Sequence, residues 1–299
     1  MQGIILLKKP KGITSFSAVS RVRRLCGIKR VGHTGTLDPL AEGVLPILVG
    51  RATALSSYVT DADKSYIARV RLGLTTDTED ITGEVLKELP VSVTEAELIA
   101  AANAFSGKIM QVPPMYSAIS QNGVRLYKLA REGKTVEREA REIVIKKIEV
   151  SDFDGRDFTL SVCCSKGTYI RSLCRDIGEK LGCGATLTEL LRTETAGFSI
   201  ENAVALEDLS EENVCAFLKP ADLAVAHLPF TSVTEKQAIR FSNGGELDLT
   251  RIKGSFSDRE LVRVKFGEIL LGLGIVMAER GILKVECVIN DAKGSDCGA

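Results

Sequence analysis

The sequence has no tryptophan, only two histidines among 299 residues and no long apolar run. No stretch approaches the roughly 20 consecutive apolar residues that a membrane-spanning helix needs. The first residues also lack the apolar core and cleavage site of a signal peptide. We therefore expect a soluble, cytoplasmic protein that uses no membrane.

Residues that bind transition metals are scarce and scattered. His33 and His227 lie far apart, and the eight cysteines form no repeated close pairs. We expect no zinc site, because structural zinc needs several such ligands at short spacing. The chain is too long and too poor in cysteine to resemble a disulfide-stabilised scaffold, so reduced, buried thiols are the better interpretation.

The charges balance overall, with 39 basic and 39 acidic residues, but they are unevenly distributed. No acidic residue precedes Asp38, whereas eight basic residues do: Lys8, Lys9, Lys11, Arg21, Arg23, Arg24, Lys29 and Arg30. A basic face in this segment would attract a phosphate backbone, and a solvated face paired with acids elsewhere is an equal alternative. The acidic stretch from Glu201 to Asp222 is expected to avoid RNA.

Asp38 lies in the segment Val31-Gly-His-Thr-Gly-Thr-Leu-Asp38-Pro-Leu-Ala-Glu-Gly-Val-Leu-Pro46, which is punctuated by glycine and proline. Gly32 and Gly35 permit backbone angles that other residues avoid, and Pro39 disfavours helical geometry at Asp38. The carboxylate is therefore presented on a loop. This pattern is typical of a catalytic aspartate, although an Asp-Pro turn alone is usually structural.

Read at full length, this segment resembles the catalytic motif of the TruB family, tRNA pseudouridine synthases that isomerise uridine 55 in the T loop. Four further blocks stand in the family's order: Lys8-Lys-Pro-Lys-Gly-Ile-Thr-Ser15, Lys64-Ser-Tyr66, Gln111-Val-Pro-Pro-Met-Tyr-Ser-Ala118 and Gly167-Thr-Tyr-Ile-Arg-Ser172. The resemblance covers nearly the whole chain. It implies base flipping, followed by detachment of uracil from the ribose and reattachment through C5.

The resemblance also assigns roles to individual residues. Asp38 is the essential nucleophile or base, Arg171 is its ion-pair partner, and Tyr66 stacks on the target base and handles a proton. Attack on the anomeric carbon, addition to C6 and a glycal route all remain open. The isomerisation needs no cofactor and no metal. The expected substrate-binding residues are His33, Lys9, Lys64, Gly35, Thr36 and Leu191.

The apolar patterns predict an α+β fold. Strands are expected at 3–7, 44–49, 66–72 and 158–164, and a capping box predicts a helix from Thr94 through Phe105. Another helix is expected to be capped by Ser15, to end at Gly27 and to bury Phe16, Val19, Val22 and Leu25. Because the strands come in local runs, a mixed, largely antiparallel sheet with helices is favoured over a doubly wound parallel one.

Three regions are expected along the chain: a catalytic domain over 1–228, a small β-barrel over 229–290 and a disordered tail over 291–299. The barrel region has a helix cap at Thr234–Gln237, an alternating strand up to Phe266, a two-residue turn at Gly267-Glu268 and a closing strand near Leu283. Its position resembles that of the family's RNA-binding PUA domain. A barrel with no RNA role is the alternative.

The leading hypothesis is thus a monomeric enzyme that acts on the T arm of tRNA and requires no protein partner. A non-catalytic RNA-binding or RNA-folding module that keeps the same cleft is the alternative, and the retention of Asp38, Tyr66 and Arg171 disfavours it. A guide-RNA-dependent relative would typically carry basic extensions for partner proteins, and we expect the short N-terminus and bland tail to disfavour this alternative. Glu42 departs from the family pattern, and we expect its carboxylate to point away from Asp38.

Overall fold

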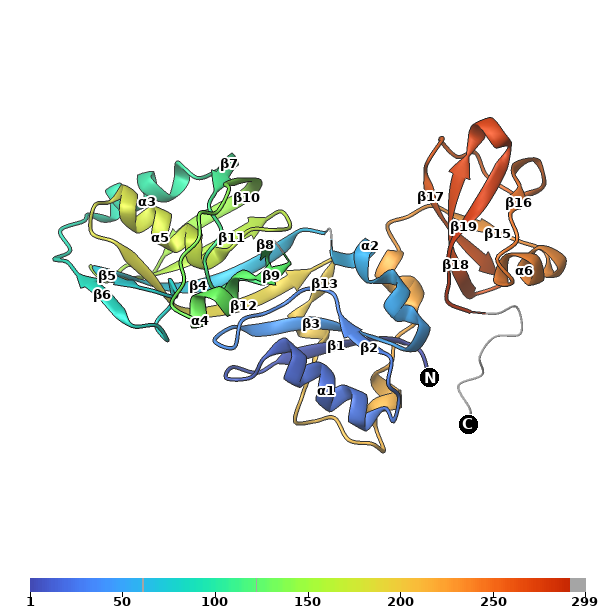
Figure 1. Ribbon diagram of the computed structural model, residues 1–299, viewed down its shortest axis with the longest axis horizontal. Coiled ribbons are helices and arrows are strands. Elements are labelled where there is room, and N and C mark those ends of the chain that lie inside the picture. Colours follow the sequence, from blue (N-terminus) through green and yellow to red (C-terminus); the bar gives the residue numbers. More distant parts are fainter. Residues whose placement is uncertain (61, 122, 291–299) are drawn as a thin grey trace.

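The computed structural model describes residues 1–60, 62–121 and 123–290. A large sheet with its helices occupies one end of an elongated molecule, and a smaller sheet formed by the C-terminal strands occupies the other (Figure 1). The expected disordered tail lies outside the described residues. In the described part of the chain, no helix combines the length and apolar character needed to cross a membrane.

The large sheet has ten strands, and eight of them run in the order β14-β1-β3-β12-β4-β11-β10-β7, with β13 paired to β12 and β2 paired to β3. Only the β1–β14 and β3–β12 pairs are parallel, which confirms the mixed, largely antiparallel sheet. The strands are β1 (Gly3–Lys9), β2 (Val31–His33), β3 (Glu42–Val49), β4 (Lys64–Leu72), β7 (Gly107–Gln111), β10 (Arg141–Ser151), β11 (Asp157–Cys164), β12 (Ala185–Thr195), β13 (Phe198–Ser199) and β14 (Val204–Ala205).

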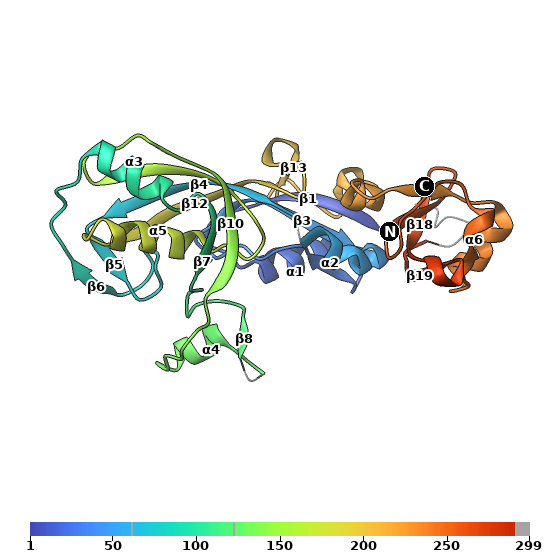
Figure 2. The same cartoon turned by 90° about the horizontal axis from the view of Figure 1, so that it is seen from above.

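Helices and short hairpins surround this sheet. The helices are α1 (Ser15–Leu25), α2 (Ser56–Thr60), α3 (Glu95–Asn103), α4 (Leu126–Arg131) and α5 (Ile170–Lys180). The hairpins are β5 (Leu74–Thr76) with β6 (Val85–Glu88), and β8 (Ser120–Gln121) with β9 (Val124–Arg125). Figure 2 shows that α4 and β8 project away from the sheet, whereas α5 packs against β12 and β4.

Helix α1 differs in two details from its prediction. The cap is Thr14, whose hydroxyl accepts from the amide of Ser17, and Ser15 is instead the first helical residue. Phe16 is 69% exposed, because only the face with Ala18, Val19 and Val22 packs against the sheet.

The expected capping box at Thr94 is present, but α3 ends at Asn103, two residues before Phe105.

The C-terminal sheet has five strands in the order β15-β17-β18-β19-β16 and forms the small barrel-like unit expected from the sequence. Its strands are β15 (Phe230–Ser232), β16 (Leu247–Asp248), β17 (Leu261–Phe266), β18 (Ile269–Met277) and β19 (Ile282–Val288), and α6 (Glu235–Ser242) packs beside them. The predicted cap at Thr234 and the two-residue turn at Gly267-Glu268 are both confirmed. Only Gly267 of that turn has a positive φ, as a glycine-first hairpin requires.

Apolar side chains also join the two sheets. One cluster combines Ile4 and Leu48 of the large sheet with Leu270, Leu273 and Ile289 of the C-terminal unit. The hydroxyl of Tyr58 donates to Glu286 at 3.0 Å across the same junction. The C-terminal sheet is therefore packed onto the large one through a shared core.

The cysteines are reduced in the described part of the chain, but they are not all buried. Cys26, Cys164, Cys174 and Cys183 are core residues, whereas Cys215 is exposed. The prediction of buried thiols was wrong for Cys215 because its short 3-10 helix lies at the surface, a placement that composition does not reveal. Cys297 lies outside the described residues.

Gly43 is a point at which β3 and β12 approach closely. Its φ is 118°, and a Cβ built on it would lie 2.2 Å from the carbonyl oxygen of Arg192. We expect Gly43→Ala to lower the free energy of unfolding by about 4 kcal/mol, from backbone strain and overpacking combined. Urea unfolding tests this prediction, with Gly281→Ala as the control. Gly281 also has a positive φ, but a Cβ added to it would meet no atom within 4 Å. The control should therefore lower the free energy of unfolding by only about 1 to 2 kcal/mol. Equal losses would contradict the close approach.

Candidate active site

The loop between β2 and β3 carries Asp38 and is fastened at both sides of that residue. The hydroxyl of Ser15 accepts from the amide of Leu37 at 2.8 Å and donates to its carbonyl at 3.0 Å. The amide of Gly12 donates to the carbonyl of Pro39 at 2.7 Å. The segment Lys8–Ser15 therefore holds the aspartate loop in place, which accounts for the presence of both motifs in one sequence.

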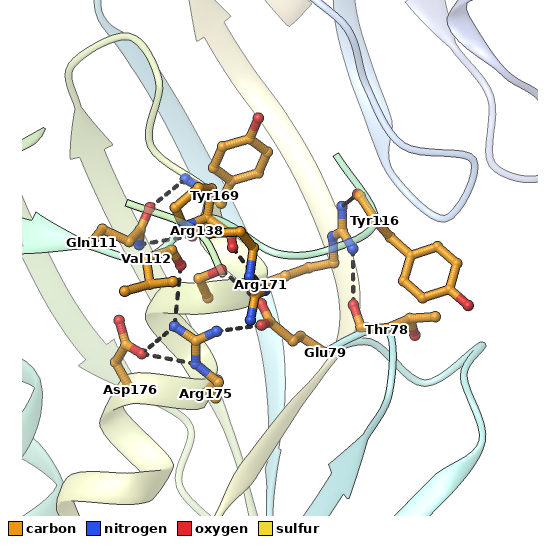
Figure 3. Close-up of polar contacts among 12 residues, drawn as sticks. Thr78, Glu79, Gln111, Val112, Tyr116, Arg138, Tyr169, Arg171, Arg175 and Asp176 are labelled. Carbon is orange, nitrogen blue, oxygen red and sulfur yellow. Dashed lines mark hydrogen bonds and ion pairs between the residues drawn. The ribbon is translucent and has the colours of Figure 1, made fainter. Parts of the chain in front are cut away.

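Asp38 pairs with Arg171, the partner that the family resemblance implied. The Nε of Arg171 lies 2.9 Å from Oδ2 of Asp38, and the side chains are 4% and 37% exposed respectively. Nη1 and Nη2 of Arg171 donate at 2.8 Å to the carbonyls of Thr78 and Tyr116 (Figure 3). Together with Asp38, these contacts fix the guanidinium through all three of its nitrogens. A fixed cation therefore lies beside a carboxylate that is still partly exposed to solvent.

A second carboxylate, Asp80, faces the same guanidinium. Its Oδ2 lies 3.9 Å from Nε of Arg171, and the residue is buried. Its Oδ1 accepts from the hydroxyls of Thr78 and Thr82 at 3.0 and 2.5 Å. Sequence reasoning missed Asp80, since it stands outside the family blocks and its proximity to Arg171 arises only from folding.

The turn that carries Asp80 is tied to α5 by Glu79. The carboxylate of Glu79 accepts from the hydroxyl of Ser172 at 2.7 Å and pairs with Arg175. Arg175 also bonds to Asp176 at 2.7 Å and to the carbonyl of Val112 at 3.3 Å (Figure 3). These contacts hold the turn, the helix and the segment after β7 as one support for Arg171.

Tyr66 lies on the buried face of β4, together with Lys64. The burial pattern alternates along the strand, with both residues inside, as the spacing predicted. Burial raises the pKa of the Tyr66 hydroxyl, while the charge of Arg192 and a hydrogen bond with it act in the opposite direction. The ammonium of Lys64 donates to the carbonyl of Ala62 at 2.8 Å.

Gly35 and Thr36 lie in the same loop as Asp38, and His33 is the last residue of β2, directly before that loop. The amide of Gly35 donates to Nδ1 of His33 at 3.2 Å, a bond that requires this nitrogen to be unprotonated. Burial and, to a smaller extent, the charge of Arg192 lower the pKa of His33, which favours the same neutral form. Thr36 is exposed, so its side chain is open to a ligand.

Lys9 does not occupy the position that a phosphate contact needs. Its side chain is fully buried, and its ammonium donates at 2.8 Å to the carbonyls of Pro10 and Ile13. Burial lowers the pKa of Lys9 to about 8, although the negative charges of Asp38 and Glu42 act against this shift. Lys9 therefore fastens the segment before α1, a role that a count of basic residues cannot distinguish from RNA binding.

The register of β12 with β4 also corrects the prediction that Leu191 binds the substrate. Leu191 pairs with Ile67, whose side chain is 42% exposed on the face away from Tyr66. Leu190 pairs with Ala68 and shares the buried face of Tyr66. Because side chains alternate along a strand, a shift of one residue moves the leucine to the other face. Leu190 is therefore the leucine that lies on the active-site face.

Two family models match the chain. The TruB family pseudouridylate synthase N-terminal domain matches residues 23–170, and the tRNA pseudouridylate synthase B C-terminal domain matches residues 171–226. Two curated relatives are the tRNA pseudouridine synthases B of Clostridium tetani, 46% identical with 92% of this chain and 95% of the relative covered, and of Ralstonia nicotianae, 45% identical with 97% and 95% covered.

Solved structures share the fold along almost the whole chain. A chain in the crystal structure of a Cbf5-Nop10-Gar1 complex superposes with a TM-score of 0.76 at 28% identity, covering 98% of this chain and 86% of that chain. A chain in an H/ACA RNP bound to a substrate RNA containing 2'-deoxyuridine superposes with a TM-score of 0.75 at 26% identity, covering 97% and 86%.

Proposed function

The chain belongs to the TruB family of pseudouridylate synthases, and we propose that it isomerises uridine 55 in the T loop of tRNA to pseudouridine. The observation that carries the proposal is the ion pair of Asp38 and Arg171 at 2.9 Å, in which the carboxylate is more than a third exposed. An accessible carboxylate that is paired with a fixed cation on a fastened loop suits a nucleophile or base. The non-catalytic alternative gives no reason for keeping a buried arginine aimed at it.

The chemistry needs only side chains of this chain. Isomerisation of uridine neither oxidises nor hydrolyses it, so no cofactor or metal is required. Asp38 acts as nucleophile or base, by attack on the anomeric carbon, addition to C6 or removal of the C2′ proton. Arg171 orients Asp38 and balances its charge, and Tyr66 stacks on the base and transfers a proton.

The substrate is reached by flipping the uridine out of its loop. We assign the contacts with the RNA to His33, Gly35, Thr36 and Lys64, which lie in or beside the loop of Asp38. Residues 1–228 form the catalytic domain in this proposal, and residues 229–290 bind a neighbouring part of the RNA. The enzyme works as a cytoplasmic monomer on the T arm, without a protein partner. The relatives at 45–46% identity are named tRNA pseudouridine synthase B, which favours a stand-alone tRNA enzyme over the guide-dependent alternative.

The experiment that tests the proposal is tritium release from tRNA labelled at C5 of uridine, followed by mapping of the modified position. We expect release to plateau at one tritium per tRNA from a substrate labelled only at uridine 55. Binding of tRNA without release would support the non-catalytic module instead. Release that maps outside the T loop would contradict the proposed substrate.

Leu190 and Leu191 form a matched pair for testing the substrate contact. Leu190 shares the face of Tyr66, so we expect Leu190→Ala to slow single-turnover tritium release by about 10-fold or more, because it loosens the packing around a positioned base. We expect Leu191→Ala to stay within about 3-fold of wild type, because its side chain lies on the other face. The reverse order of effects would contradict the assignment of Leu190.

A further inference from the structure

Arg192 is a fully buried arginine that sequence reasoning did not single out. It stands in β12 with 1% of its surface exposed and is among the largest completely buried side chains. Its Nε donates to the carbonyl of Val44 at 2.9 Å, and its Nη2 donates to the carbonyl of Gly35 at 3.2 Å. Within residues 1–60, 62–121 and 123–290, no carboxylate lies within ion-pair distance of it, whereas Arg171 has Asp38 as its partner.

A buried cation without a carboxylate is costly. Removing a guanidinium from water is repaid only when strong hydrogen bonds and favourable charges surround it. The carbonyls of Val44 and Gly35 supply hydrogen bonds to the guanidinium of Arg192. Its charged form is favoured by the hydroxyl of Tyr66. The position of Arg192 is thus explained better by what it does to Tyr66 than by stability alone.

The backbone places the two side chains together. Arg192 pairs directly with Tyr66 across β12 and β4, so both point to the same face of the sheet. Gly35 and Gly43 enclose Arg192: a Cβ on Gly35 would lie 3.6 Å from its Nη1, and a Cβ on Gly43 would clash with its backbone. The guanidinium is therefore fixed between the loop of Asp38 and the ring of Tyr66.

We propose that Arg192 is a positioning residue for the isomerisation, which orients the Tyr66 hydroxyl and stabilises its ionised form while a proton is transferred. This proposal rests on the proposed function. When uridine becomes pseudouridine, C5 loses its hydrogen to form the new bond to ribose, and N1 gains one. The Tyr66 hydroxyl first gives its proton to solvent. The phenolate then takes the proton from C5, and the electron pair of the C5–H bond restores the C5=C6 double bond. In the anomeric and glycal routes the C6=N1 π pair moves to N1, and in the C6 route the C6–O pair leaves with the Asp38 carboxylate. Water protonates N1.

The charge effects agree with this role. The positive charge of Arg192 opposes the rise in the pKa of Tyr66 that burial causes, whereas Asp38 and Cys164 add to that rise. A neighbouring cation is the ordinary means of keeping a buried phenol able to ionise. The same charge helps to keep His33 neutral. One buried guanidinium thus acts on both the proton-transfer group and the loop.

The competing explanation is that Arg192 only holds the loop through the carbonyl of Gly35. A double-mutant cycle with Tyr66→Phe separates the two explanations. Single-turnover tritium release is measured with excess enzyme for wild type, Arg192→Met, Tyr66→Phe and the double variant, and tRNA binding is measured for all four. Wild-type release is the premise of the cycle, so its absence would overturn the proposed function and not this assignment.

If Arg192 acts through the hydroxyl, Arg192→Met slows release by about 100-fold in the wild-type background but by less than about 3-fold when Tyr66 is already phenylalanine. The tRNA dissociation constant then stays within about 3-fold of wild type in all four proteins. Equal slowing in both backgrounds would overturn the proposal, because a loop-holding role does not depend on the Tyr66 hydroxyl.

A second measurement covers the case in which Arg192→Met folds poorly or Tyr66→Phe is too slow to follow. Arg192→Lys keeps the charge but not the two-carbonyl geometry, and Arg192→Gln keeps part of the hydrogen bonding but not the charge. With 3-fluorotyrosine in place of tyrosine, fluorine NMR follows the ionisation of Tyr66, whose signal is assigned by its loss in Tyr66→Phe. The pKa of Tyr66 is expected to be higher in Arg192→Gln than in Arg192→Lys. An unchanged pKa in both variants would overturn the proposal.

Discussion

Asp38→Asn is expected to lower the single-turnover rate of tritium release by about 10⁴-fold, since the amide can act neither as a nucleophile nor as a base. The substitution keeps the size of the side chain and can still accept a hydrogen bond from Arg171. The fold should therefore be unchanged, and the tRNA dissociation constant should remain within about 3-fold of wild type. The loss of rate would then lie in the chemical step. Rapid-quench measurement with excess enzyme excludes product release as the limiting step.

Glu42→Gln is the matched control for Asp38→Asn. Glu42 lies in the same segment at the start of β3 and carries the same charge. We expect it to point away from Asp38, so its neutralisation should change the rate by less than about 3-fold. If Asp38→Asn kept its rate, or if Glu42→Gln lost as much as Asp38→Asn, Asp38 would not be the essential carboxylate.

Replacement of Arg171 is expected to impair both the reaction and the fold. Arg171→Met leaves the buried Asp80 facing Asp38 without the cation between them, and it frees the carbonyls of Thr78 and Tyr116. Breaking a buried pair by removing one partner costs about 3 to 5 kcal/mol in the free energy of unfolding. The rate of tritium release should fall by about 1000-fold, because Asp38 loses both its orienting partner and the positive charge beside it.

Arg171→Lys separates charge from geometry. A lysine restores the positive charge, but its single ammonium cannot bond to Asp38, Thr78 and Tyr116 as the guanidinium does. We expect it to recover less than about a tenth of the lost rate, measured by tritium release alongside urea unfolding. Full recovery would show that only the charge of Arg171 matters, and full activity of Arg171→Met would remove the ion pair from the proposal.

Much of the site could be predicted from the sequence because its residues lie in motifs with their own local geometry. Glycine and proline around Asp38 specify an exposed loop whatever the rest of the chain does. The alternation along 64–72 places Lys64 and Tyr66 on one face, and the structure confirms it. The capping boxes at Thr94 and Thr234 are equally local and are both present.

Positions that depend on pairing between distant segments could not be predicted in this way. The sequence does not state the register of β12 against β4, and this register alone decides that Leu190 and Arg192 share the face of Tyr66 while Leu191 does not. Lys9 was one of eight basic residues before Asp38, and only its packing beneath the segment before α1 shows that its ammonium is internal.

The sequence by itself determined the loop of Asp38 and the kind of fold, since turn chemistry and periodicity act over a few residues. The tertiary structure decided which cations serve that aspartate and how. Arg171 reaches Asp38 from a helix more than a hundred residues away, and Arg192 is buried beneath the loop from a strand further along the chain. The free energy of a charge depends on its burial and its partners, and both are set only when distant segments pack together.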